Sequence, residues 1–271
     1  MVSSDHRGST VARAVAARTN RIVEGLRNLD AGGLAQPSLL PGWSRLTIAC
    51  HLRYGAVALQ RMTSDTQHGR PTAYYPEGRQ QQRQSTLVPR DGESSSDVVE
   101  SLATSSRILH DRWASIEGSE WEVMVTEPGD NPDLGPLPLD RLALMRLTEV
   151  EVHGDDLGLG LGDWSETFVE AALPFRLDRL NTRRTNHRAF DDRLEGSWLV
   201  VADHGPAYLV TVDGADVRSE PADPNASASA LIRGSRRDIL ALLLGRPTTG
   251  PLTMAGDLTF AASFQRAFPG P

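Results

Sequence analysis

The sequence predicts an α+β protein with two domains: a four-helix bundle at residues 1–188 and a small α+β domain at residues 189–271. Three observations predict this. A chain of 271 residues exceeds the usual length of one domain, so we expect two cores. Apolar residues recur at helical spacing through the N-terminal part. Near residue 197 the pattern changes to short strands separated by turn residues.

The first two helices are marked by apolar stripes. Residues 10–29 form the first, with apolar positions at Val11, Val15, Ile22, Leu26 and Leu29, and glycines at 32 and 33 end it. The second is expected to start after Ser44, a residue type that caps helix N-termini. One stripe then carries Ile48, His51, Leu52, Gly55, Leu59 and Met62. His51 therefore faces inward.

A polar stretch separates these helices from the next pair. Residues 64–96 are rich in Gln, Arg, Ser, Gly and Pro, so we expect a long loop with one short helix near residues 78–85. Residues 98–116 predict a third helix, and a fourth begins near Leu139. Its inward row holds Leu142, Met145, Glu149, Val152 and His153.

The rest of the chain predicts one further amphipathic segment and the second domain. Residues 166–180 form that segment, and the basic, polar run 181–188 is interpreted as a linker. Strands are expected at 198–202, 208–212 and 230–232, with turns at 204–206 and 213–214. Helices at 236–244 and 258–268 complete a small α+β domain.

Composition restricts the function classes. Lys and Arg total 28 against 35 Asp and Glu, and without a basic block the net charge of -7 argues against a nucleic-acid partner. No apolar run reaches the ~20 residues that span a bilayer, and residues 1–8 lack a secretory signal. We therefore expect a cytoplasmic protein without a membrane partner. The single cysteine, Cys50, is interpreted as a small core residue, and any metal would need His and carboxylate ligands.

Three residues predict a metal site. Glu149 and His153 are four residues apart, which places both side chains on one helix face. His51 lies on an apolar stripe, where an unpaired imidazole is costly to bury. Two histidines and one carboxylate leave a fourth position open, as in catalytic zinc sites. Asp156, three residues after His153, is placed to accept a hydrogen bond from that imidazole or to bond at the helix end.

A simpler interpretation remains open for each feature. A Glu-x-x-x-His pair arises often by chance, and an inward histidine is commonly a hydrogen-bonded core residue. His110 and His204 are interpreted as a helix-surface residue and a turn residue.

Two motifs resemble a known family. LPGWSRLTIACHL at residues 40–52 resembles the "PGW…HL" signature of the DinB-like, mycothiol-dependent maleylpyruvate isomerase family. RLTEVEVHGDDLG at residues 146–158 resembles that family's second signature, "R…E-x-x-x-H-x-x-D-L-G". The likeness extends to Gly234, residues 240–246 and 256–257, which look like its sterol-carrier-like domain. The resemblance implies that His51, Glu149 and His153 hold zinc.

The same resemblance implies mycothiol, the thiol of actinobacteria, as cosubstrate. A metal-bound thiolate would attack a small electrophile. Relatives include isomerases, S-transferases and enzymes that exchange ergothioneine for mycothiol in lincosamide biosynthesis. We favour S-transfer or thiol exchange over cis-trans isomerisation, because the long polar segment 64–96 would admit a larger substrate.

Three arginines are candidates for binding that substrate: Arg79, Arg83 and Arg246. For each, a solvated surface arginine is the alternative. A competing hypothesis is a non-enzymatic protein that binds a metal or a ligand. The electrophile, the metal used in the cell and the oligomeric state are left open by the sequence.

Overall fold

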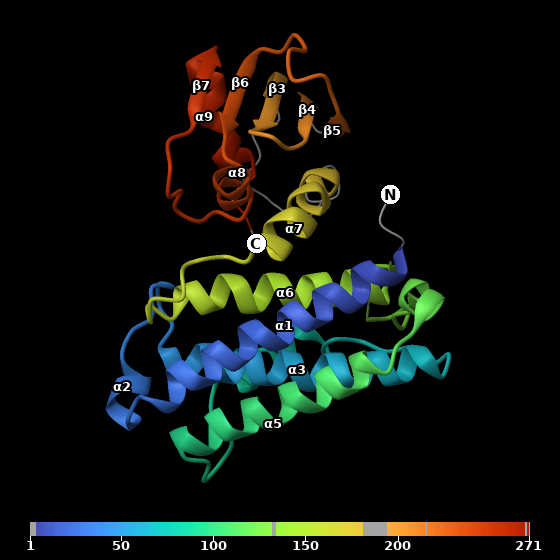
Figure 1. Cartoon of the computed structure of the whole chain (residues 1–271), viewed down its shortest axis with the longest axis vertical. Coiled ribbons are helices and arrows are strands. Elements are labelled where there is room, and N and C mark those ends of the chain that lie inside the picture. The colour runs from blue at the N-terminus through green and yellow to red at the C-terminus, as the bar shows by residue number, and fades with distance from the viewer. Residues whose placement is uncertain (1–3, 132–133, 181–193, 215, 269, 271) are drawn as a thin grey trace. The chain divides into compact units, whose positions relative to one another are not determined.

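The structure, a computed structural model, describes residues 4–131, 134–180, 194–214, 216–268 and 270 (Figure 1). The chain divides into two compact units, Met1–Phe168 and Val169–Pro271, each taken by itself below. This division assigns residues from 169 onward to the second unit, whereas the sequence placed 166–180 in the first domain. The expected linker, 181–188, lies outside the described residues, and the boundary at 188 stays a prediction.

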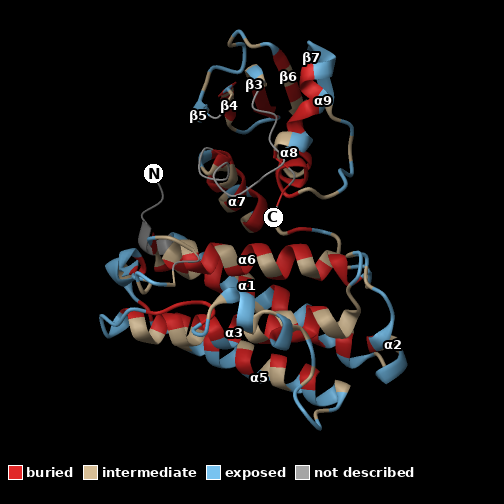
Figure 2. Ribbon diagram, turned by 180° about the vertical axis from the view of Figure 1, so that it is seen from behind, coloured by how far each residue is buried: buried red, intermediate tan, exposed pale blue. Residues whose placement is uncertain are grey.

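Four long helices make up most of the first unit: α1 (Ser4–Arg27), α3 (Arg45–Gln67), α5 (Ser95–Ala114) and α6 (Leu139–Asp156). Helix α1 packs against α5 and α6, and α3 packs against the same two helices. Their apolar stripes are buried between them (Figure 2). The sequence predicted all four, because each has a helical apolar period that one face can bury. Short helices are α2 (Ala31–Ala35), α4 (Arg79–Gln82), η1 (Gln84–Leu87) and η2 (Gly118–Glu122).

Local capping explains where α3 and α5 begin. The Ser44 hydroxyl accepts a 3.0 Å hydrogen bond from the Thr47 backbone N–H, as expected from the residue type. At α5, Ser94 and Asp97 form a capping box. The Ser44 cap thus sets where α3, the helix that carries His51, begins.

The polar segment between α3 and α5 differs from the expected loop. Helix α3 continues to Gln67, and the expected short helix is present as α4 and η1. Residues 72–75 are buried rather than solvent-exposed. The backbone N–H of Thr72 bonds to Thr126 O at 2.8 Å, and Arg61 donates to Ala73 O at 2.7 Å. Part of this segment therefore belongs to the core.

A short ladder near α6 was not predicted. Strands β1 (Met124–Val125) and β2 (Leu137–Pro138) pair antiparallel just before α6 begins. Two-residue strands have too few positions to show an alternating pattern, so the sequence carries no usable signal for them.

The second unit contains a five-stranded sheet in the order β5-β4-β3-β6-β7. The strands are β3 (Glu195–Ala202), β4 (Ala207–Asp213), β5 (Asp216–Pro221), β6 (Ala230–Gly234) and β7 (Thr253–Gly256). Only the β3–β6 pair is parallel among these ladders. Helices α7 (Glu166–Asp178), α8 (Arg236–Leu243) and α9 (Leu258–Ala267) complete the described elements of this part.

The sequence predicted β3, β4 and β6 but not the two edge strands. Strand β7 is exposed along its whole length and β5 along most of it, so neither buries an apolar face that would mark it. The core lies around Trp198, whose ring stacks on Phe260 at 4.3 Å and donates from Nε1 to the Phe260 carbonyl.

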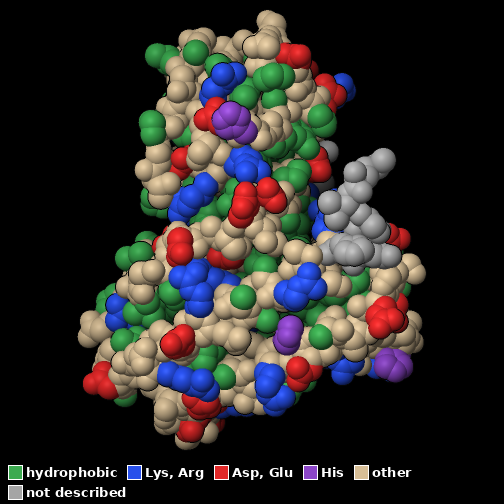
Figure 3. Space-filling view, in the orientation of Figure 1, with side chains coloured by type: hydrophobic (Ala, Val, Ile, Leu, Met, Phe, Trp, Pro, Cys, Tyr) green, Lys and Arg blue, Asp and Glu red, His purple; other side chains and the backbone are tan. Residues whose placement is uncertain are grey.

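The distribution of charged side chains and the lengths of the helices agree with what the composition led us to expect. On the face seen in Figure 3, acidic and basic side chains are interspersed within each unit. Among the helices of the described ranges, none is both long and apolar enough to cross a membrane.

Candidate active site

Helices α3 and α6 bring His51, Glu149 and His153 together in the first unit. The His51 Nε2 atom lies 3.4 Å from Oε1 of Glu149, and the two imidazole rings are 5.0 Å apart and perpendicular. One turn of α6 separates Glu149 from His153, so both face α3. The three side chains are 13%, 24% and 15% exposed, which leaves them partly accessible to a small ligand.

The Glu149 carboxylate is held on both oxygens. Arg146, one turn earlier on α6, donates from Nη1 to Oε2 at 3.0 Å, and the Tyr74 hydroxyl donates to Oε1 at 3.2 Å. A second Arg146 nitrogen, Nη2, donates to the Leu52 carbonyl at 2.9 Å. Because the Arg146 side chain is fully buried, its charge acts on the carboxylate with little screening.

These contacts set the charges of the site. Burial lowers the pKa of His51 to about 4, more than the attraction of Glu149 raises it, so the imidazole is neutral at pH 7. Burial raises the pKa of Glu149, but attraction to His51, Arg146 and His153 outweighs it and the pKa is lowered. Since His51 is neutral, we attribute the ionised carboxylate mainly to Arg146. A neutral imidazole beside a carboxylate is the form that a metal requires.

Gly55 makes room for this arrangement. It lies one turn after His51 on α3, facing the carboxylate. A Cβ at this position would lie 2.7 Å from Arg146 Nη1, 2.9 Å from the Tyr74 hydroxyl and 3.0 Å from Glu149 Oε2. Any larger residue would push these groups apart.

Trp43 covers the histidines. Its ring stacks on His153 at 5.9 Å with an interplanar angle of 12°, and meets His51 edge-on at 5.4 Å. The loop that carries it is tied to the end of α6, since Leu39 N–H donates to Asp156 O at 2.7 Å and Arg45 Nε donates to Leu157 O at 3.0 Å. These two hydrogen bonds to the end of α6 hold the loop, and therefore Trp43, in position over the histidines.

The two imidazoles differ in how they are held. Nδ1 of His153 lies 2.9 Å from Oδ2 of Asp156, a buried carboxylate, which leaves Nε2 as the nitrogen for a ligand. His51 points Nε2 toward Glu149, and its buried Nδ1 has no partner among the described residues. Asp156 thus engages Nδ1 of His153, whereas in His51 it is Nε2 that faces a carboxylate, that of Glu149.

The donor types fit a divalent metal, but their orientations are those of a hydrogen-bonded cluster. Within the described part of the chain, no group of three or more His, Cys, Asp or Glu side chains is arranged so that it could hold a metal ion. The Glu149 oxygens face Arg146 and Tyr74. Coordination by all three ligands would require side-chain adjustments at this cluster.

The three candidate arginines occupy different places. Arg83, after α4, is half-buried and near enough that its charge lowers the pKa of His51, and it makes no hydrogen bond or ion pair to another described side chain. Arg79 is exposed, with its guanidinium 5.7 Å from the centre of the Tyr75 ring. Arg246 follows α8 in the second unit, so it is not placed relative to His51.

Four residues of the site were not given roles by sequence reasoning: Trp43, Gly55, Tyr74 and Arg146. A charged residue one turn before Glu149 on the same helix face was a usable signal for Arg146. Tyr74 had none, because it lies in a segment without periodicity. Of the other residues considered, Cys50 is fully buried, which raises the pKa of its thiol to about 11, and His204 is an exposed turn residue.

Comparisons with known proteins agree on one family. Residues 13–158 match the model of the mycothiol maleylpyruvate isomerase N-terminal domain. A crystal structure of a mycothiol-dependent maleylpyruvate isomerase has a TM-score of 0.66 at 20% identity, covering 94% of this chain and 96% of that chain. A histidine-to-alanine mutant of that isomerase has a TM-score of 0.64, with the same identity and coverage. At this identity the likeness shows the fold. No curated protein sequence matches the chain.

Proposed function

Because the chain belongs to the mycothiol maleylpyruvate isomerase N-terminal domain family, we propose that it is a mycothiol-dependent enzyme with a zinc ion held by His51, Glu149 and His153. The observation that carries the proposal is the convergence of two imidazoles and an ionised carboxylate in a partly open site. These are the ligand types of catalytic zinc sites with an open fourth position.

We also propose a sterol-carrier-like relationship for the second unit, supported by its sheet and helices, and a cytoplasmic location.

Each residue of the site has a task in this proposal. When bound, the metal would favour the thiolate form of the thiol sulfur. Arg146 and Tyr74 orient the Glu149 carboxylate. Asp156 fixes the proton of His153 on Nδ1 and leaves Nε2 for the ligand position. Trp43 limits the access of water to both imidazoles.

Isomerisation is the first candidate reaction. In it, the thiolate adds to the double bond of an unsaturated acid, the new single bond rotates, and the thiolate leaves, so the thiol is regenerated. The fold likeness to an isomerase supports it. The argument for a larger substrate is weaker than the sequence suggested, because residues 72–75 are packed in the core.

S-transfer or thiol exchange is the second candidate. The thiolate displaces a leaving group from an electrophile, forming a C–S bond as the bond to the leaving group breaks. The exposed Gln- and Arg-rich residues around α4 support it, since Arg83 lies there with no described side-chain partner. In either reaction we propose that Arg83 binds a substrate carboxylate, with Arg79 and Arg246 as further candidates.

One experiment separates the candidates. Purified protein is loaded with zinc and incubated with mycothiol and either maleylpyruvate or an alkylating electrophile, and products are measured by mass spectrometry and chromatography. Isomerisation changes the retention time of the acid without consuming thiol, whereas transfer consumes thiol in proportion to product. Binding of zinc and thiol without any turnover of either substrate would favour a non-enzymatic binding protein. Absence of zinc binding would overturn the metal site.

A further inference from the structure

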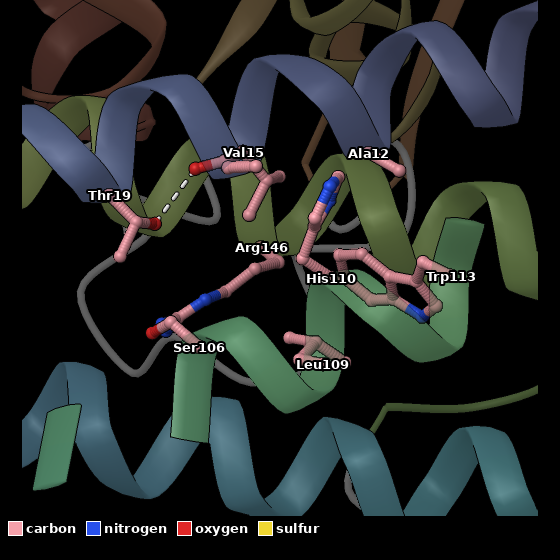
Figure 4. A pocket seen from close by; sticks show the side chains of 9 residues that line it. Ala12, Val15, Thr19, Ser106, Leu109, His110, Trp113 and Arg146 are labelled. Atoms are coloured by element: carbon pink, nitrogen blue, oxygen red, sulfur yellow. Dashed lines mark hydrogen bonds between the residues drawn. The ribbon is translucent and has the colours of Figure 1, made fainter. Parts of the chain in front are cut away.

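The bundle is nearly closed where Arg146 faces α1 and α5. A cavity of about 10 Å³ remains there, lined by residues of α1, α5 and α6 (Figure 4). His110, which the sequence placed on a helix surface, is half-buried and lines this cavity. Such a volume is too small for any ligand larger than one water molecule. By contrast, the half-buried Trp43 contacts both imidazole rings of the site and covers part of the surface that a ligand could otherwise use.

Trp43 is the last residue of a tight turn that the local sequence favours. Its backbone N–H donates to the Leu40 carbonyl at 3.1 Å, which closes a four-residue turn over residues 40–43. Pro41 at the second position and Gly42 at the third are typical of a type II turn, and Gly42 has the positive φ, 79°, that this turn requires. A Cβ on Gly42 would meet nothing within 4 Å, so the need for glycine is conformational rather than steric.

The side chain of Ser38 holds this turn at both ends. Its hydroxyl donates to the Trp43 carbonyl at 2.8 Å and accepts a hydrogen bond from the Leu40 backbone N–H at 3.1 Å. The hydroxyl oxygen also lies 3.2 Å from the Leu40 carbonyl. The backbone N–H of Ser38 donates to the same Trp43 carbonyl at 2.9 Å. Ser38 therefore fixes the first and the last residue of the turn relative to each other.

The turn and His153 share one anchor on α6. The backbone carbonyl of Asp156 accepts a hydrogen bond from the Leu39 N–H at 2.7 Å, and its carboxylate lies 2.9 Å from Nδ1 of His153. One residue thus sets the position of the turn relative to the imidazole. With both held in this way, the ring of Trp43 lies nearly parallel to that of His153, at an interplanar angle of 12°.

We propose that Ser38 is a positioning residue for Trp43. Its hydroxyl fixes the turn at residues 40–43, and the fixed turn holds the indole against both imidazoles, so that Trp43 limits how readily a ligand reaches His51 and His153. This role of Ser38 stands on the contacts of the turn and of the indole alone. Its effect on zinc rests on the proposed function.

Chemical labelling of histidines measures how far a small reagent reaches each imidazole. The metal-free full chain is treated with diethylpyrocarbonate, and the labelled peptides are quantified by mass spectrometry. The rates at His51 and His153 are divided by the rate at His204, an exposed turn residue. Ser38→Ala should raise both ratios about fivefold, the factor that one hydrogen bond typically contributes to an equilibrium. Ser38→Thr keeps the hydroxyl and should stay near the wild type.

A second variant tests the turn without changing Ser38. Gly42→Ala should also raise both ratios, because alanine disfavours the positive φ of this position. Gly69→Ala is its matched control, since Gly69 has a φ of 66°, has nothing within 4 Å of an added Cβ, and lies beyond the opposite end of α3. Ser115→Ala is the control for Ser38→Ala, because it removes a hydroxyl that bonds to the Arg112 carbonyl at 2.8 Å on α5. Both controls should leave the ratios unchanged.

Unchanged ratios in Ser38→Ala, or an equal rise in Ser38→Thr or in the control variants, would overturn the positioning role of Ser38. Unchanged ratios in Gly42→Ala as well would show that the turn does not hold the cover. Cys50 is fully buried, so its reaction with a thiol reagent in Ser38→Ala would mean that the whole unit has loosened, which also overturns the role.

Release of zinc to excess chelator tests the consequence for the metal. It should be about fivefold faster in Ser38→Ala than in Ser38→Thr or the wild type, and equal rates would overturn the effect on zinc. If the wild type binds no zinc, the proposed function fails, while the labelling rates still decide the role of Ser38.

Discussion

Replacing Gly55 by alanine tests whether this glycine maintains the geometry of Glu149. The new Cβ would lie 2.7 Å from Arg146 Nη1, where ordinary contacts begin at 3.4 Å. The guanidinium must therefore retreat by about 0.7 Å, which stretches its 3.0 Å hydrogen bond to Glu149 beyond useful range.

Two opposing effects set the magnitude. Alanine is favoured over glycine inside a helix by about 1 kcal/mol. Breaking a buried charge pair costs about 3–5 kcal/mol, and because Glu149 is partly exposed the lower end applies. We expect Gly55→Ala to lower the free energy of unfolding by about 2 kcal/mol and to weaken zinc binding by about tenfold or more.

Urea unfolding followed by circular dichroism measures the stability, and competition with a chelating dye measures zinc affinity. Gly25→Ala on α1 is the matched control. Its Cβ would meet only the flexible tips of Leu159 and Leu161, the nearer at 3.3 Å, so stability should stay equal or rise by up to about 1 kcal/mol. If Gly55→Ala is as stable as Gly25→Ala and binds zinc as tightly as the wild type, the steric reasoning is wrong.

Three further predictions concern the ligands, the units and the cysteine. Replacing His51, Glu149 or His153 by alanine should sharply reduce the zinc content measured by elemental analysis. His204→Ala should leave the zinc content unchanged, because His204 is an exposed turn residue. Full zinc occupancy in all three ligand variants would refute the site. A chain truncated after residue 188 should remain helical by circular dichroism and should bind zinc, because the first unit holds all proposed ligands. If the truncated chain is unfolded, the two units share one core. Cys50 is buried, and burial raises the pKa of its thiol to about 11. It should therefore react with a thiol reagent at pH 8 only after the protein is unfolded in urea. Rapid reaction in the native state would contradict the burial argument.

The sequence by itself determined the long helices and the members of the candidate site. Each helix has an apolar period that repeats every turn, and the residue type at Ser44 marks the start of α3. The four-residue spacing of Glu149 and His153 places them on one face of a helix because of helix geometry alone. Such patterns are local, so they can be read along the chain without knowing what packs against them.

Tertiary structure alone decided what surrounds the carboxylate. Tyr74 comes from a segment without periodicity and reaches Glu149 across 75 positions of sequence. Gly55 matters only because α6 passes close enough to bring Arg146 against it. The edge strands β5 and β7 likewise bury no face of their own and exist because β4 and β6 present free backbone groups to pair with. These features depend on contacts between distant residues, and no spacing along the chain encodes them.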